Sequence, residues 1–212
     1  DVLLEGTQGF GLSLNHGTYP YVTSRDVNAS SLLSDSGIAP NHHSKTIGVL
    51  RTYPIRVAGN SGPTGSEEIS WEEIGWRSGA PRAPHEYTTV TGRLRRVFEQ
   101  NIDELKRAVL VNQPDELALT FVDYINFADY GKQYFSELSP ESKDYVSWIQ
   151  DELAVPVTLI GTGEQTLIDR RGARPRAQVQ ALFPDNFYGY EWDSGQVRRF
   201  LRRKLDYGPR LF

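Results

Sequence analysis

The chain has 212 residues, of which 38% are hydrophobic and 24% are charged, and its formal net charge is −4. No apolar run approaches the roughly 20 residues that a membrane-spanning helix needs, so we predict a cytoplasmic protein without a membrane segment. The absence of Cys excludes disulfides, thiolate catalysis and Cys-based zinc sites.

The most specific stretch of the sequence is Glu5 to Ser24, which reads EGTQGFGLSLNHGTYPYVTS. The apolar residues before it are typical of a strand, and its glycines allow tight turns and a close approach to a ligand. A turn-rich surface loop would have a similar composition. Because the run of small, polar and aromatic residues is so specific, we favour a ligand-binding segment in which Gln8 and Thr23 face the ligand.

Strand-like and helix-like stretches alternate along the chain, which is typical of an α/β fold. The predicted strands are Val2 to Glu5, Ile47 to Val57, Leu117 to Val122 and Val155 to Ile160. The predicted helices start at a capping box at Ser70, cover Asn101 to Asn112, follow Ser139 and Pro140, and begin near Ser194. Strands that follow helices imply parallel crossover connections, so we expect a mostly parallel central sheet flanked by helices.

Charge is uneven along the chain. Residues 169–212 hold ten Lys or Arg against five Asp or Glu, whereas residues 1–168 hold 13 against 22. We predict that residues 1–168 form the α/β portion and that residues 169–212 are a basic extension packing on the same domain. A basic tail could bind nucleic acid, but the acidic main body would repel phosphates, so we favour a solvated helix face.

Two further residue types are interpreted as structural. His42 and His43 lie in a polar loop with no third ligand nearby, so we favour a solvated loop over a metal site. The four tryptophans are interpreted as core or interface residues: Trp71, Trp76, Trp148 and Trp192.

The segment that contains Gln8 and Thr23 resembles the adenylosuccinate synthetase family, in which EGAQG or EGTQG is followed by HGTYPYVTS. A second match, HEYTTVTGRLRR from His85, resembles the family's aspartate loop. Tyr53 to Gly59 and Leu119 to Asp123 parallel two of its strands. The resemblance covers roughly residues 2 to 163, and it implies a fold of the family's type, which is related to that of P-loop proteins.

In this family a nucleoside triphosphate phosphorylates the 6-oxygen of a purine nucleotide, and the aspartate amine then displaces that phosphate. The resemblance implies a Mg²⁺-dependent ligase, usually a homodimer, with L-aspartate, IMP or dGMP, and GTP or ATP as substrates. It assigns the purine nucleotide to Gln8, Thr23 and Arg93. It assigns the aspartate to Val90, Thr91, Gly92, Arg93 and Arg95. It assigns the base of the triphosphate to Phe121, Asp123, Gly161, Thr162 and Gly163.

Three departures from the family pattern bear on substrate choice. Val90 stands where many members carry Thr, which removes one hydroxyl, although the archaeal-type branch also has Val there. Phe121 replaces a Lys, and an aromatic ring can stack on any base, which relaxes the preference for GTP toward ATP. Glu164 replaces a Pro. Phage relatives share TQGFGLSL and EISWEE with this chain and join aspartate to dGMP using ATP, so IMP and dGMP both stay open.

The family's phosphate loop, GDEGKGK, with its catalytic Asp and accompanying general-acid His, does not occur in these 212 residues. We therefore assign no catalytic residue and no metal ligand to this chain, and we expect a C-terminal portion of a longer protein that is inactive alone. His16 lies inside the HGTYP match and is predicted to have a structural or substrate-orienting role. The alternatives to a ligase are a non-catalytic nucleotide or aspartate sensor and a nucleic-acid-binding module.

Overall fold

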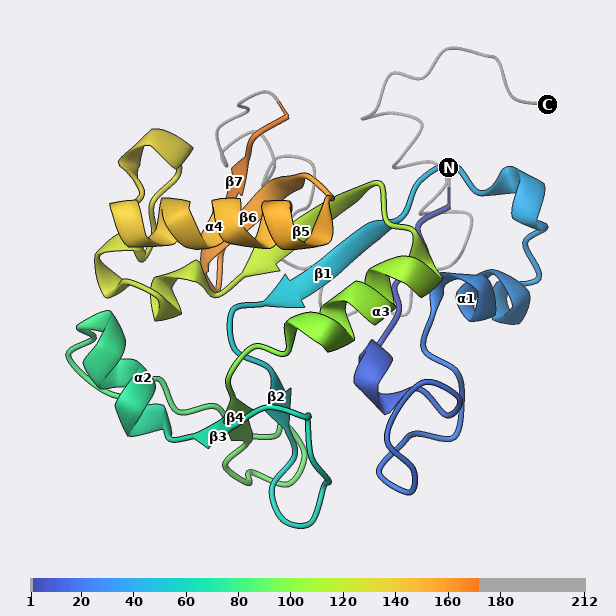
Figure 1. The fold of residues 1–212 in the computed structure, drawn as a ribbon, viewed down its shortest axis with the longest axis horizontal. Coiled ribbons are helices and arrows are strands. Elements are labelled where there is room, and N and C mark those ends of the chain that lie inside the picture. The colour runs from blue at the N-terminus through green and yellow to red at the C-terminus, as the bar shows by residue number, and fades with distance from the viewer. Residues whose placement is uncertain (1, 172–212) are drawn as a thin grey trace. The chain divides into compact units, whose positions relative to one another are not determined.

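Figure 1 shows the computed structural model, in which residues 2–171 are described. Of these, residues 4–171 belong to one compact unit. The predicted helix near Ser194, Trp192 and all of the predicted basic extension beyond residue 171 lie outside the described residues. Among residues 2–171, no helix is long and apolar enough to cross a bilayer.

The central sheet has four strands in the order β1-β5-β6-β7. Its strands β1 (Ile47–Arg51), β5 (Glu116–Thr120) and β6 (Val157–Gly163) run parallel to one another. The fourth strand, β7 (Thr166–Asp169), runs antiparallel to β6. The inner strand β5 is apolar at its three middle residues and buried over its first four, as expected for a strand covered on both faces. The predicted α/β fold with a mostly parallel sheet is confirmed.

Two long helices, α3 (Ile102–Asn112) and α4 (Pro140–Leu153), lie side by side over one face of this sheet (Figure 1). Each begins where the sequence predicts, because Asn101 accepts a hydrogen bond from Glu104 N at 3.1 Å and Ser139 accepts one from Ser142 N at 3.3 Å. Burial of each large apolar side chain beneath them contributes about 1.5–3 kcal/mol. The larger core includes Leu117, Leu119, Val122, Val146, Ile149, Leu153, Val157 and Ile160.

Two shorter helices are α1 (Ala29–Ser36) and α2 (Trp71–Ser78). The capping box predicted at α2 is half confirmed. Ser70 Oγ accepts from Glu73 N at 3.0 Å, whereas the Glu73 carboxylate pairs with Arg77 at 2.5 Å instead of turning back to the cap. The described residues also form 3₁₀ turns at Phe10–Leu12 (η1), Pro40–His42 (η2), Val122–Tyr124 (η3), Phe127–Asp129 (η4) and Phe135–Glu137 (η5).

A second sheet, which the sequence did not predict, has three short antiparallel strands in the order β2-β4-β3. They are β2 (Ile55–Arg56), β3 (Glu68–Ile69) and β4 (Arg96–Phe98). The prediction of one strand over Ile47–Val57 is wrong, because the chain leaves the central sheet after β1. Pro54, which has no N–H to donate to a ladder, lies between β1 and β2. A smaller core packs against this sheet and consists of Tyr53, Trp71, Ile74 and Val97.

One further prediction is corrected by the structure. The strand predicted at Val2 to Glu5 is wrong, because these residues belong to neither sheet of the described part and Val2 and Leu3 are 74% and 87% exposed. An extended apolar segment needs a partner for its N–H and C=O groups, and neither sheet of the described residues supplies one. Of the tryptophans predicted to be core or interface residues, Trp71 is buried, whereas Trp76 and Trp148 are 83% and 39% exposed, so for these two the interface role stays a prediction.

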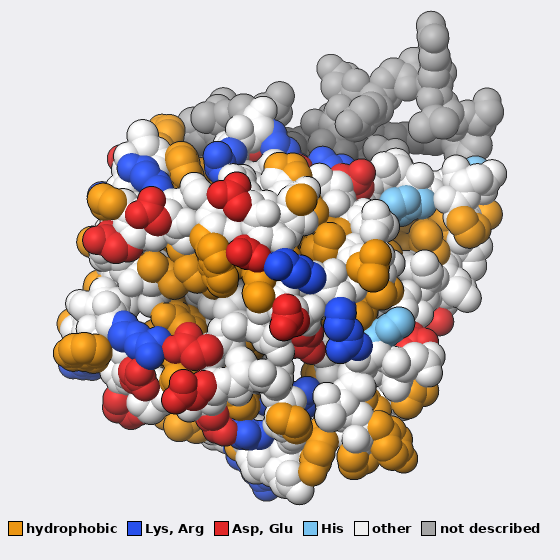
Figure 2. All heavy atoms as spheres, in the orientation of Figure 1, with side chains coloured by type: hydrophobic (Ala, Val, Ile, Leu, Met, Phe, Trp, Pro, Cys, Tyr) orange, Lys and Arg blue, Asp and Glu red, His pale blue; other side chains and the backbone are white. Residues whose placement is uncertain are grey.

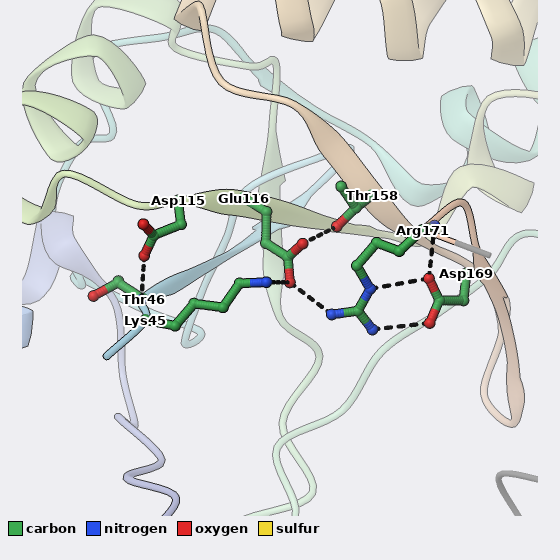
Figure 3. A network of polar contacts seen from close by, with 7 residues as sticks. All are labelled: Lys45, Thr46, Asp115, Glu116, Thr158, Asp169 and Arg171. Atoms are coloured by element: carbon green, nitrogen blue, oxygen red, sulfur yellow. Dashed lines mark hydrogen bonds and ion pairs between the residues drawn. The ribbon is translucent and has the colours of Figure 1, made fainter. Parts of the chain in front are cut away.

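At the amino-terminal end of the parallel strands, a charge network joins β1, β5, β6 and β7 (Figure 3). Glu116, only 3% exposed, accepts from Lys45 at 2.9 Å and from Arg171 at 2.7 Å. It also accepts from the Thr158 hydroxyl at 2.8 Å, while Arg171 pairs with Asp169 at 2.9 Å. Burial by itself raises the pKa of Glu116, but the hydrogen bonds from Lys45 and Thr158 together with the charges of Arg171 and Lys45 outweigh it, and the pKa is lowered. This network ties the sheet together where β1, β5 and β6 begin and where the antiparallel β7 ends.

Candidate functional site

The structure brings Gln8 and Thr23 together, since Gln8 Nε2 donates to Thr23 Oγ1 at 2.7 Å. The segment folds back on itself between them, and Thr23 N donates to the Leu12 carbonyl at 2.8 Å. Gln8 has a φ of 72°, a left-handed conformation that non-glycine residues seldom adopt. An amide and a hydroxyl held side by side can address a base edge or a phosphate.

A close approach of backbone to backbone at Gly17 shapes the same segment. Gly17 N donates to the Ser13 carbonyl at 2.7 Å. A Cβ on Gly17 would lie 2.5 Å from the Gly11 carbonyl oxygen and 2.7 Å from that of Ser13. Because both atoms belong to the backbone, a larger residue would force the segment open. The glycine of HGTYP is therefore required by packing.

Two charged residues that the sequence analysis did not single out hold this segment in place. Asp26 accepts from Ser13 Oγ at 2.8 Å, and hydrogen bonds of this kind lower the pKa of Asp26. Arg56, which is 8% exposed, donates to the carbonyl oxygens of Gly11 and Tyr21, both at 3.3 Å. A signal for Arg56 was available, because it is an isolated charge in an apolar stretch, YPIRVAG.

The predicted aspartate loop is a closed turn with an exposed tip. Thr88 N donates to the Arg93 carbonyl at 2.9 Å, and Arg93 N donates to Thr88 Oγ1 at 3.0 Å. At the tip, Val90 is 96% exposed, the hydroxyls of Thr88 and Thr91 are 2.6 Å apart, and Gly92 has a φ of 59°, which favours glycine. The turn thus presents backbone groups, hydroxyls and the exposed Arg93 side chain to solvent.

Arg95 lies deeper than the rest of this loop. Its backbone N donates to the Glu86 carbonyl at 2.8 Å, and its Nη1 is 4.0 Å from the Glu86 carboxylate. Its Nε is buried with no hydrogen-bond partner among the described residues. A buried donor without a partner costs about 1–3 kcal/mol, and an anionic ligand could supply the missing acceptor.

The residues predicted to bind the base of the triphosphate gather where β5 and β6 end. Phe121 and Asp123 follow β5, and Gly161–Gly163 close β6 beside the η3 turn. This edge of a parallel sheet is the usual place for a ligand. Asp123 is 6% exposed, its Oδ1 has no partner among residues 2–171, and burial raises its pKa to about 6. Thr162 is buried and donates its hydroxyl to the Lys132 carbonyl at 2.7 Å, so that hydroxyl is already engaged.

Direct polar contacts join some of the predicted ligand-binding segments but not all of them. Within the described residues, no hydrogen bond or ion pair joins Gln8 or Thr23 to Arg93 or Asp123. The aspartate loop and the β5 end are linked by Glu86, which sequence reasoning did not single out as a bridge. Its carboxylate pairs with Arg51 at the end of β1 and accepts from Tyr124 Oη at 3.2 Å.

Residues 2–171 contain no group of three His, Asp or Glu that could hold a metal ion. His43 Nε2 lies 2.8 Å from Thr46 Oγ1, and His16 stacks on Phe10 with ring centroids 5.1 Å apart. On the face shown in Figure 2, acidic and basic side chains of the described residues lie next to one another. This mixture differs from the single-sign field that steers a protein to nucleic acid.

Residues 1–130 match the family model described as adenylosuccinate synthetase. The adenylosuccinate synthetase of Archaeoglobus fulgidus is 38% identical over 172 residues, which are 80% of this chain and 49% of that protein. That of Pyrococcus sp. (strain ST700) is 42% identical over 172 residues, which are 80% of this chain and 48% of that protein. The chain thus spans about half the length of the curated relatives it matches.

Two solved structures are also similar. The succinoaminodeoxyadenylate synthetase of cyanophage S-2L, bound to dGMP and to dATP as an energy donor, aligns with a TM-score of 0.61 at 30% identity. This alignment covers 84% of this chain and 48% of that chain. The adenylosuccinate synthetase of Plasmodium falciparum aligns with a TM-score of 0.67 at 22% identity, covering 78% of this chain and 49% of that one. The second likeness concerns the fold alone.

Proposed function

Because this chain belongs to the adenylosuccinate synthetase family, we propose that it provides substrate contacts of a ligase that forms a C–N bond. In the proposed reaction, the purine loses its N1 proton as its 6-oxygen takes the γ-phosphoryl group of a nucleoside triphosphate, and the nucleoside diphosphate leaves. The aspartate amine then attacks C6, phosphate leaves with the oxygen, and the amine loses a proton. The observation that carries this proposal is a pair of unsatisfied buried atoms, Arg95 Nε and Asp123 Oδ1, in the loops where the family binds aspartate and the base.

The aspartate would bind at the turn between Thr88 and Arg93. Its carboxylate would accept from the guanidinium groups of Arg93 and Arg95, whose planar forks suit bidentate recognition. The backbone and hydroxyl groups of Thr91 and Gly92 would complete the contact. Val90, which has no hydroxyl, would contribute only its backbone.

The purine nucleotide would bind along the segment that holds Gln8 and Thr23. The Gln8 amide can pair with a base edge, and the Thr23 hydroxyl can donate to a phosphate. Arg93 would touch both the nucleotide and the aspartate. A shared contact fixes the position of one substrate relative to the other and so lowers the entropic part of the barrier.

The base of the triphosphate would lie at the ends of β5 and β6. An ionised Asp123 accepts hydrogen bonds, so it selects a base edge that presents N–H donors, as guanine does. Phe121 would supply an aromatic surface, and the backbone of Gly161–Gly163 would line the other side. Phosphoryl transfer of this kind uses Mg²⁺ to offset phosphate charge. The described residues offer no three-ligand site, and the contacts above do not depend on one.

The direct test is the substitution Arg93→Ala. It should weaken L-aspartate binding by about 30- to 300-fold, because a charged, bidentate contact is lost, and should weaken purine-nucleotide binding much less. Titration calorimetry with each ligand measures both constants. Arg82→Ala removes an exposed Arg outside the loop and is the matched control. An unchanged aspartate affinity in Arg93→Ala would reject the proposed role.

A second candidate function within the same class is synthesis from dGMP with ATP. It is favoured by the likeness to the cyanophage synthetase, whose solved structure contains dGMP and dATP, and by Phe121 in place of the family's Lys. Turnover assays of the protein as its gene encodes it, with IMP or dGMP and with GTP or ATP, decide between the two. Ligand binding without any product would instead favour the non-catalytic sensor. We also propose, on the family resemblance alone, that the protein acts as a homodimer in the cytoplasm.

A further inference from the structure

Glu86 lies at the base of the aspartate loop, and three side chains share its carboxylate. Arg51 Nη2 forms an ion pair with Glu86 Oε1, and Tyr124 Oη donates to the same oxygen at 3.2 Å. Arg95 Nη1 lies 4.0 Å from the other oxygen. The side chains of Arg51 and Glu86 are only 23% and 17% exposed, so their interaction is less screened than a pair on the surface.

The surroundings hold this arrangement in one geometry. Burial, together with the neighbouring charge of Glu86, raises the pKa of Tyr124, so the phenol stays protonated and remains a donor. The buried Trp71 packs edge-on against the Tyr124 ring with centroids 6.3 Å apart, and its Nε1 donates to the Arg95 carbonyl at 2.7 Å. One aromatic residue therefore fixes both Tyr124 and the backbone of Arg95.

Arg51 makes a second contact, on the side of the triphosphate base. Its Cζ lies 3.8 Å from the centroid of the Phe121 ring, within the range of a cation–π interaction. Its Nε donates to the Tyr53 carbonyl at 3.3 Å. The guanidinium therefore covers one face of Phe121, and that face cannot also stack on a base.

We propose that Arg51 is a positioning residue for two ligands at once: through Glu86 it orients Arg95 toward the aspartate carboxylate, and through the Phe121 ring it sets the surface on which the triphosphate base rests. This inference rests on the proposed function. Arg51 itself touches neither ligand. One guanidinium group makes both contacts, pairing with Glu86 through Nη2 and covering Phe121 with its flat face, so a cation without that face separates the two effects.

Three variants of the protein as its gene encodes it test the two contacts. Glu86→Gln keeps a hydrogen-bond acceptor for Arg51 but removes the charge that holds Arg95, so the dissociation constant of L-aspartate should rise about tenfold. Arg51→Lys keeps a cation for Glu86 but loses the planar group over Phe121, so mainly the triphosphate should bind about three- to fivefold more weakly. Arg51→Met should weaken both.

Calorimetric titrations of L-aspartate, with IMP present and again with dGMP present, and of GTP and ATP analogues that cannot be hydrolysed, give these constants. Lys106→Met is the matched control, because it removes a cation 2.7 Å from Glu152 between α3 and α4. It should change neither constant. The thermal midpoint of each variant separates positioning from general destabilisation.

The expected result is a split, in which Glu86→Gln affects mainly aspartate and Arg51→Lys affects mainly the triphosphate. Equal losses of both affinities in these two variants, or a lower thermal midpoint with both affinities unchanged, would overturn the inference while leaving the proposed function standing. Wild-type protein that bound neither ligand would reject the proposed function, and this inference would fall with it.

Discussion

Glu116 and Asp123 belong to the same stretch of chain around β5, yet their carboxylates have opposite surroundings. At the amino-terminal end of the sheet, Glu116 accepts hydrogen bonds or ion pairs from Lys45, Thr158 and Arg171 (Figure 3), and its pKa is lowered. At the carboxyl end, Asp123 is as deeply buried, has an oxygen without a partner among the described residues, and has a pKa raised to about 6.

The difference separates a structural charge from one kept for a ligand. A buried charge whose partners are all present stabilises the fold, whereas a buried charge that lacks partners costs folding free energy and is retained where function requires it. The two ends of the sheet therefore respond in opposite directions when their carboxylates are neutralised. Each prediction below tests that opposition.

The largest effect is expected for Asp123→Asn. At pH 7 the folded protein must ionise a carboxyl whose pKa has moved from 3.8 to about 6. At about 1.4 kcal/mol for each unit, the variant should be more stable than wild type by about 1–3 kcal/mol while binding the triphosphate about tenfold more weakly or worse. Urea unfolding and calorimetric titration measure the two quantities. Asp151→Asn, at an exposed site in α4, is the control; a less stable Asp123→Asn protein would contradict the assignment.

The raised pKa of Asp123 also predicts the pH range over which the stability of the protein changes. Because its folded pKa is raised, its stabilising contribution is fully present below the unfolded value of 3.8 and is lost as pH rises through about 6. The stability difference between Asp123→Asn and wild type should thus grow from near zero at about pH 4 to its full size at about pH 7. Over that range, wild-type affinity for GTP should rise as Asp123 ionises. A difference that does not change with pH would show that Asp123 titrates outside this window.

A smaller effect of opposite sign is expected for Glu116→Gln. Losing a buried, charged acceptor that serves Lys45 and Arg171 should destabilise the fold by about 1–2 kcal/mol. Since the folded pKa of Glu116 is lowered, the contribution that the variant loses is present above the unfolded value of 4.5 and disappears in wild type as pH falls through the lower folded pKa. Nucleotide and aspartate affinities should be unchanged. If Glu116→Gln lost as much ligand affinity as Asp123→Asn, Glu116 could not be separated from Asp123 as a purely structural carboxylate.

Local sequence patterns were sufficient to predict those features, such as helix starts, that depend on residues close together in the chain. The helix starts at Ser139 and Ser70 were placed correctly, because each cap satisfies an N–H group a few residues ahead. The predictions that failed concern strands, whose formation depends on pairing with residues far away in the chain. Val2 to Glu5 has the composition of a strand but no ladder partner among the described residues, and the short strands of the second sheet are too brief to show a period.

In the candidate site, too, the sequence identified individual residues but not the contacts between distant parts of the chain. The family resemblance selected Gln8 and Thr23, and in the structure the two side chains are hydrogen-bonded to each other. The resemblance could not reveal that Arg51 contacts both Glu86 and Phe121, since those residues lie 35 and 70 positions further along the chain. Such a contact depends on how β1 and β5 pair, which no local pattern encodes.

The smallest effect is expected for Lys45→Met, which removes one of the two cations at Glu116. The Lys45 side chain is 44% exposed and that of Arg171 is 42% exposed, so each pair is partly screened by water and worth about 0.5–1 kcal/mol. Arg171 and Thr158 would still satisfy Glu116, which explains why one cation should matter less than the carboxylate. Chemical denaturation of Lys45→Met, Glu116→Gln and the double variant forms a cycle. Because the ion pair of Lys45 among the described residues is with Glu116, the double variant should be little less stable than Glu116→Gln alone. Additive losses would mean that Lys45 stabilises the sheet through some other contact.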